Sequence, residues 1–108
     1  MASPSIRRHK WRPQKWEDAI FHVPEILTDF KPLAIGVHAA LFAMRVDGVS
    51  KSSVRALISD HVRNERYLKN LKAGSIRFNI AYIPDGMVTK KDQEYAEREL
   101  GKLDHQNG

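Results

Sequence analysis

The chain has 108 residues, of which 42% are hydrophobic and 29% are charged, and it contains no cysteine. This length suits one domain with a single core, and the lack of cysteine excludes disulfide bonds and thiolate metal sites. No apolar run approaches the roughly 20 residues of a membrane span, and the N-terminus lacks the apolar segment of an export signal. We therefore expect a cytoplasmic protein with no membrane partner.

The formal net charge of +5 is distributed unevenly along the chain. Residues 1–15 carry five Lys or Arg and no acid, and Pro4 and Pro13 disfavour regular structure, which predicts a flexible basic arm. Residues 51–77 carry seven Lys or Arg and two acids, whereas from Asp85 onward six acids face four bases. A phosphate-rich partner bound between residues 51 and 77 accounts for this distribution.

The first half of the domain is predicted to be helical. One helix is expected from about Trp16 into the twenties, where Pro24 ends or restarts it. A second helix is expected from about residue 35 to residue 46, followed by a stop at Gly48.

Ser50 is predicted to cap the next helix, because a serine hydroxyl accepts a first-turn N–H. The buried face of this helix is expected to carry Val54, Leu57, Ile58 and His61. Its opposite face then exposes Lys51 and Arg55, which lie one turn apart.

The second half mixes short helices and strands. A short helix over residues 65–69 is expected to end near Gly74, and residues 77–82 alternate as a strand. Turn residues at 84–86 are expected to precede a second short strand at 87–89. A closing helix from Lys90 to about residue 103 completes the domain, with Thr89 as its cap and with Tyr95, Leu100 and Leu103 on its apolar face. The fold class is α+β: a mainly helical single domain, residues 16–108, with a small β-sheet.

Several of these residues are candidates for binding phosphate or bases. Ser50, Lys51 and Ser52 begin a helix whose free N–H groups attract anions, although Ser50 alone is more typical of an ordinary cap. If Tyr67 and Arg77 face that helix start, they offer a stacking surface and a planar fork for phosphate. Alternatively, Tyr67 is a core residue and Arg77 forms a surface ion pair.

Lys69 and Lys72 are candidate backbone contacts or simply solvated side chains. Enzymatic chemistry is not indicated, since no Walker loop, nucleophile elbow or dinucleotide motif occurs. The histidines show no metal-ligand spacing at positions 9, 22, 38, 61 and 105. We expect no catalytic residue, no metal and no cofactor.

A DNA-binding helix-turn-helix is one alternative. Residues 48–58 resemble the turn and recognition helix of that motif, but Met44 stands where a small residue is usual. The motif also leaves the segment from Tyr67 to Arg77 unexplained. A protein-interaction module without nucleic-acid affinity is a further alternative.

A broader resemblance spans about residues 24–103. The matching segments follow in order and with similar spacing: residues 32–37, 49–55, 66–68, 72–80 and 86–89. Together they resemble the ProQ/FinO RNA-binding domain. The resemblance implies a minimal, monomeric RNA chaperone that acts in post-transcriptional regulation. Its partners would be small RNAs and mRNAs, bound at terminator hairpins with a single-stranded 3′ tail.

The resemblance also assigns roles to individual residues. Lys51 and Arg55 match cations on the family's binding face, and the surface residues that the family uses for RNA are matched by Arg66, Tyr67 and Arg77. The helix start at residues 50–52 matches the region that receives the RNA 3′ end. Two departures, Ala34 and Ser59, replace cations found in many members, so the expected compensating cations are Arg63, Lys69 and those of the N-terminal arm.

Overall fold

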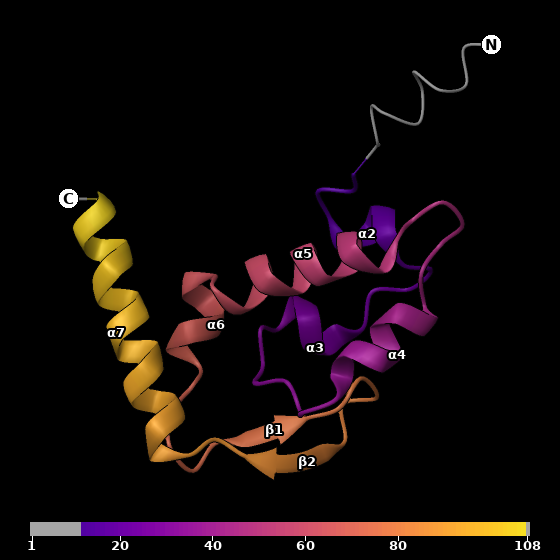
Figure 1. Ribbon diagram of the computed structural model, residues 1–108. Coiled ribbons are helices and arrows are strands. Elements are labelled where there is room, and N and C mark those ends of the chain that lie inside the picture. Colours follow the sequence, from indigo (N-terminus) through magenta and orange to yellow (C-terminus); the bar gives the residue numbers. More distant parts are fainter. Residues whose placement is uncertain (1–11, 108) are drawn as a thin grey trace.

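The computed structural model describes residues 12–107 of the chain (Figure 1). Its elements, in chain order, are α2 (Trp16–Ala19), α3 (Glu25–Thr28), α4 (Val37–Ala43), α5 (Lys51–Val62), α6 (Glu65–Lys69), β1 (Ile76–Phe78), β2 (Pro84–Met87) and α7 (Lys90–Asn107). The mainly helical α+β class is confirmed. Most of the basic arm predicted for residues 1–15 lies outside the described residues.

Helix α5 is the central element of the core. It packs against α2, α4 and α6, and α6 in turn packs against α7. The two strands form an antiparallel ribbon below these helices, while α7 stands at one side of the domain (Figure 1). Within the described part of the chain, no helix is both long and apolar enough to cross a membrane.

The predicted first helix is divided into two short ones. Helix α2 ends because Ile20 adopts an extended conformation and pairs with Arg45 in an antiparallel bridge. The Phe21 N–H then donates to the Met44 carbonyl at 3.0 Å, which holds this segment away from a helical path. Pro24 occupies the N-cap position of α3, so the helix restarts there.

Helix α4 is shorter than the predicted residues 35–46. It begins after Gly36, whose φ of 92° places it in the left-handed region, and Ile35 is left 92% exposed. At the other end, the Val46 N–H donates to the Ala19 carbonyl at 3.0 Å. This pairing with the end of α2 stops the helix before residue 46.

Helix α5 has the predicted cap and the predicted buried face. The Ser53 N–H donates to Ser50 Oγ at 3.1 Å, which confirms Ser50 as the cap. The buried side chains include Val54, Leu57, Ile58 and His61, as expected from the spacing.

The predicted strand boundaries are wrong. Strand β1 ends at Phe78 because Asn79 begins a turn, its Oδ1 accepting the N–H groups of Ala81 and Ile83 at 2.9 and 3.1 Å. The residues predicted as a turn, 84–86, instead belong to β2. Strand β1 also joins the segment before α4, since the Phe78 N–H donates to the Pro32 carbonyl at 2.9 Å.

Helix α7 begins as predicted. Thr89 Oγ1 accepts the Asp92 N–H at 3.1 Å, and an Asp92 carboxylate oxygen accepts the Thr89 N–H at 3.0 Å, which forms a capping box. The predicted apolar face needs one correction, because Tyr95 is 43% exposed and the neighbouring Ala96 is buried instead. Leu100 and Leu103 pack against the core as expected.

Candidate nucleic-acid interface

The cations of α5 form a pair beside an aromatic ring of α4. Lys51 and Arg55 are both exposed and lie one turn apart. Lys51 Nζ lies 5.8 Å, and Arg55 Cζ 5.1 Å, from the centroid of the Phe42 ring. Among the side chains that the structure describes, no carboxylate is within ion-pair distance of either cation. This α5 cation pair, Lys51 and Arg55, therefore carries charge that an anionic ligand can neutralise.

The serines at the start of α5 bind one another. Ser50 Oγ accepts the Ser53 N–H, donates to Ser53 Oγ at 3.0 Å and lies 3.1 Å from Ser52 Oγ. The capping interpretation of Ser50 is thus confirmed. Ser50 and Ser52 remain exposed beside Lys51, so these hydroxyl groups are still accessible from solvent.

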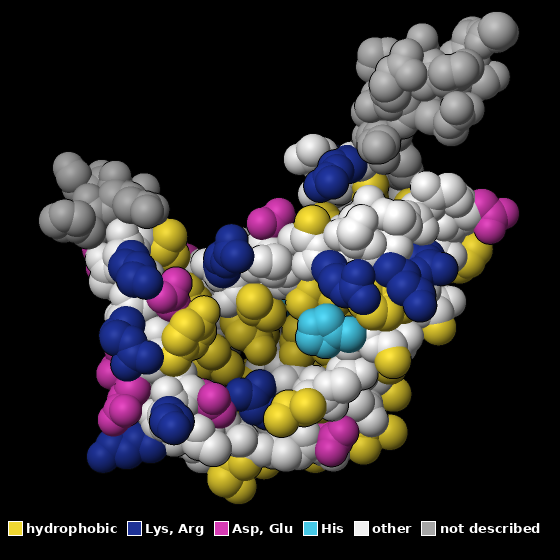
Figure 2. All heavy atoms as spheres, in the orientation of Figure 1, with side chains coloured by type: hydrophobic (Ala, Val, Ile, Leu, Met, Phe, Trp, Pro, Cys, Tyr) yellow, Lys and Arg dark blue, Asp and Glu magenta, His cyan; other side chains and the backbone are white. Residues whose placement is uncertain are grey.

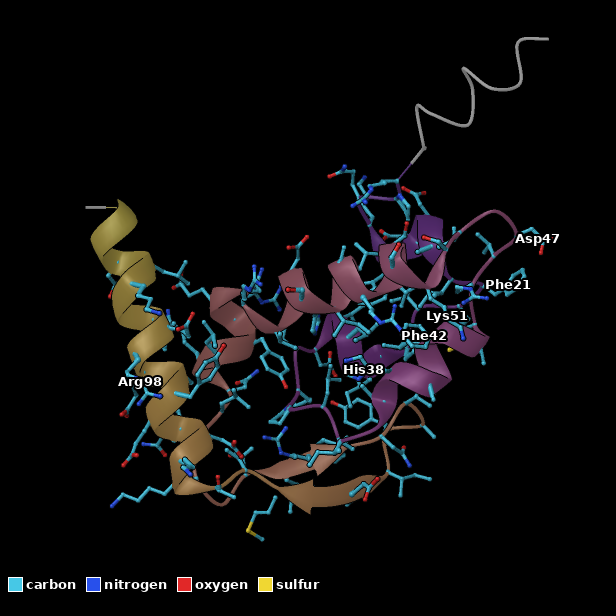
Figure 3. All side chains as sticks on the ribbon, in the orientation of Figure 1. Phe21, His38, Phe42, Asp47, Lys51 and Arg98 are labelled. Carbon is cyan, nitrogen blue, oxygen red and sulfur yellow. The ribbon has the colours of Figure 1, made fainter. Side chains whose placement is uncertain are left out.

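The α5 cation pair belongs to a hollowed face of the molecule. Figure 2 shows hydrophobic side chains on the floor of the hollow and Lys or Arg side chains around much of its rim. Figure 3 places His38, Phe42 and Lys51 close together on the α4 and α5 side of this face, with Arg98 across from them on α7. A polyanion that enters the hollow meets positive charge from several elements.

Tyr67 is a core residue and does not offer an open stacking face. Its side chain is 4% exposed, and its hydroxyl oxygen accepts the Leu33 N–H at 3.1 Å. Helix α6, which carries Tyr67, lies at the end of α5 remote from Ser50 (Figure 1). Tyr67 therefore does not provide the stacking surface that was expected at the start of α5. The alternative, that Tyr67 is a core residue, is correct.

Arg77 reaches the same backbone segment as Tyr67. Its Nη1 donates to the Leu33 carbonyl at 2.8 Å, and its Nη2 forms a 2.9 Å ion pair with Asp92. The Thr89 N–H and the Arg77 guanidinium together lower the pKa of the Asp92 carboxyl. Tyr67 and Arg77 thus converge on Leu33, ahead of α4, instead of at the start of α5 as expected.

Arg66 is held in place by aromatic stacking. Its Cζ lies 4.5 Å from the centroid of the Phe30 ring, and the His61 ring stacks on Phe30 at 4.6 Å with an interplanar angle of 4°. Arg66 is exposed, and its contact with Phe30 is a cation–π interaction that restricts the position of the guanidinium.

Lys69 and Lys72 line a groove between α6 and α7. The groove is walled by apolar residues of both elements, including Leu68 and Leu100. Lys69 forms a 2.6 Å ion pair with Glu65, and this bond raises the pKa of the lysine. Lys72 is exposed at the rim of the groove and has no carboxylate partner among the described side chains.

Sequence reasoning missed Phe42 and assigned no ligand-binding role to His38. Phe42 is half-buried, and His38, one turn earlier, is exposed with its ring centroid 6.3 Å from that of Phe42. The spacing of four residues could have paired them on one helix face. Their proximity to Lys51 depends on how α4 packs on α5, which no local pattern reveals.

Comparison with known proteins assigns the chain to a family. The model of the ProQ/FINO family matches residues 18–108. The chain belongs to the ProQ/FinO family. No curated protein matches the sequence.

Two solved structures share the ProQ/FinO fold with this chain. One is a FinO-like RNA chaperone from Neisseria meningitidis MC58, with a TM-score of 0.63 and 30% identity, matched over 69% of this chain and 62% of that one. The other is a ProQ homolog from Legionella pneumophila, with a TM-score of 0.56 and 30% identity, matched over 64% and 60%. The match therefore spans less than two thirds of either relative.

Proposed function

We propose that this ProQ/FinO chain binds structured RNA and acts as an RNA chaperone in post-transcriptional regulation. The observation that carries the proposal is the α5 cation pair, which is exposed, has no carboxylate partner among the described side chains and lies over the ring of Phe42. The description of the N. meningitidis relative as an RNA chaperone supports it. Family membership favours this function over a helix-turn-helix regulator of DNA.

The stem of a hairpin is the proposed partner of the cations. An A-form duplex is recognised by its shape and phosphates, because its deep, narrow major groove excludes side chains. Lys51 and Arg55 bind phosphates from α5, while Arg66, Lys69 and Lys72 add cations from α6 and the segment after it. Neutralising phosphates also reduces the repulsion between two RNA strands, which is the physical basis for chaperone activity.

The single-stranded 3′ tail is proposed to enter at the start of α5. Ser50 and Ser52 are exposed there beside Lys51, and their hydroxyl groups supply donors to a terminal phosphate or ribose. Tyr67 and Arg77 act indirectly, by fixing the backbone at Leu33 ahead of α4. The protein is proposed to act as a monomer on terminator hairpins of small RNAs and mRNAs, in the cytoplasm.

Three ligands test this function in one titration series: a hairpin with a 3′ U tail, the same hairpin without the tail, and duplex DNA of the same length. We expect the tailed hairpin to bind most tightly and the DNA most weakly. Equal or tighter binding of the DNA would favour the helix-turn-helix alternative. Failure to bind any of the three would favour a protein-interaction module.

A 3′ phosphate tests recognition of the RNA end. Added to the tailed hairpin, it places charge and bulk where the proposed site packs a free hydroxyl group. We expect weaker binding of the phosphorylated RNA. Equal binding of both RNAs would remove end recognition from the proposal and leave stem binding in place.

A further inference from the structure

We propose that His38, Phe42, Lys51 and Arg55 form a subsite for one unpaired nucleotide of the RNA. In this aromatic subsite the His38 ring stacks on an unpaired base beside the stem, and Lys51 and Arg55 bind the neighbouring phosphates of the stem. Phe42 is a positioning residue that holds the two cations. The inference rests on the proposed RNA binding and names the residues that distinguish an unpaired nucleotide from a duplex.

The contacts of Phe42 indicate its positioning role. Lys51 Nζ and Arg55 Cζ both lie within 6 Å of the ring centroid, the range of a cation–π interaction. Two like charges one turn apart repel each other, and no described carboxylate compensates them. The ring of Phe42 therefore draws together two cations that would otherwise extend separately into solvent.

His38 supplies an aromatic face next to these cations. Its ring is inclined at 64° to that of Phe42, so the edge of one ring meets the face of the other and the rings do not stack. The side chain is exposed and lies at the hollowed face with Phe42 and Lys51 (Figure 3). An exposed imidazole beside phosphate-binding cations is suited to stack on an unpaired base.

The other aromatic residue expected at this site is not accessible. Tyr67 is buried against Leu33 and lies within 5.5 Å of the His61 ring centroid, so it cannot stack on a base without leaving the core. Phe42 is the aromatic ring that contacts both cations, and His38 contacts Phe42. The aromatic function expected of Tyr67 is thus assigned to His38.

The test compares the tailed hairpin with the same hairpin lacking its tail. For His38→Ala we expect about tenfold weaker binding of the tailed RNA and unchanged binding of the blunt RNA, because only the tail offers an unpaired base. His38→Phe keeps an aromatic face and should bind the tailed RNA like the wild type. His22→Ala is the matched control, since His22 is also exposed but lies beside Pro24 and Tyr82.

Phe42 variants test the positioning role separately. Phe42→Leu should weaken binding of both hairpins about threefold, since the cations that it releases contact phosphates. Phe42→Tyr retains the ring and should restore wild-type binding of both RNAs. If Phe42 had only a structural role, Phe42→Leu and Phe42→Tyr would differ in thermal stability but would bind RNA with equal affinity.

The outcomes separate this inference from the function on which it rests. If Lys51→Ala weakens RNA binding while His38→Ala leaves the tailed hairpin unaffected, the subsite is wrong and RNA binding stands. Equal losses on both hairpins for His38→Ala would show a contact with the stem and would also overturn base stacking. If the wild type binds neither hairpin, the proposed function fails and the subsite fails with it.

Discussion

Tyr67 and Arg77 bind the two polar backbone groups of a single residue, Leu33. The tyrosine hydroxyl accepts the Leu33 N–H at 3.1 Å, and the arginine Nη1 donates to the Leu33 carbonyl at 2.8 Å. Leu33 also forms a parallel bridge with Phe78 of β1. This arrangement connects α6 and β1 with the segment that leads into α4.

Removing the Tyr67 hydroxyl is expected to destabilise the domain. Tyr67→Phe leaves the buried Leu33 N–H without its partner, at a cost of about 1–3 kcal/mol in the free energy of unfolding. Tyr67→Ala also creates a cavity, and the total loss should reach about 3–5 kcal/mol. Chemical denaturation measures both. A Tyr67→Phe variant as stable as the wild type would contradict the role of this hydrogen bond.

Acid is expected to destabilise the domain through His61. Burial lowers the pKa of His61 to about 4, from its usual 6.5, because the imidazole is enclosed by Phe30, Trp16 and Tyr67. The unfolded chain binds the proton more tightly than the folded one. His61 therefore does not reduce the free energy of unfolding above pH 6.5. As the pH drops from 6.5 to 4, protonation of His61 lowers that free energy by about 3 kcal/mol in total.

His61→Phe tests this dependence on pH. The variant keeps a ring against Phe30 and removes both the titrating group and the buried Nε2, which has no hydrogen-bond partner among residues 12–107. Its unfolding free energy, measured from pH 7 to pH 4, should fall less steeply than that of the wild type. Parallel curves for the two proteins would show that the acid sensitivity arises elsewhere.

A second acid-sensitive group acts at lower pH. The pKa of Asp92 is lowered from 3.8 by the Thr89 N–H and the Arg77 guanidinium, so its contribution to stability is present above pH 3.8 and is lost below it. Asp92→Asn should lower the unfolding free energy at pH 7 by about 1 kcal/mol, through a weaker helix cap and a lost ion pair. Asp104→Asn on the same helix is the control and should change it little.

Much of the helical structure could be predicted from the sequence because its signals are local. Ser50 and Thr89 identified two helix starts, and the spacing of Val54, Leu57 and His61 identified the buried face of α5. Strand boundaries could not be predicted, since the Asn79 side chain closes a turn in competition with a longer strand. The alternation of residues 77–82 therefore overestimates the length of the first strand.

The cations of the candidate site could be predicted from the sequence, but the placement of its aromatic side chains could not. Clustered cations pointed to Lys51 and Arg55, whose exposure on α5 is confirmed. Whether Tyr67 faces solvent depends on Leu33, 34 residues earlier in the chain, and that pairing leaves no local signal. For the same reason Phe42 could not be connected with the cations until the packing of α4 on α5 was known.

Stem binding and end recognition are expected to respond differently to mutation. Lys51→Ala and Arg55→Ala should each weaken a hairpin with and without its tail by similar factors, because contacts to stem phosphates carry no information about the RNA end. Lys90→Ala and Lys91→Ala are controls at the start of α7 and should have little effect. A large defect at Lys90 or Lys91 would show that RNA binds another face.

The central claim is that α5 binds RNA through phosphates, and the dependence of affinity on salt tests it most directly. Binding of the tailed hairpin is measured over a series of salt concentrations for the wild type and for Lys51→Ala. We expect the logarithm of the association constant to fall linearly with that of salt concentration, with a slope of magnitude about 3–5 for the wild type. The slope should be smaller by about 1 for Lys51→Ala. A flat response in the wild type, or identical slopes for the two proteins, would contradict the account.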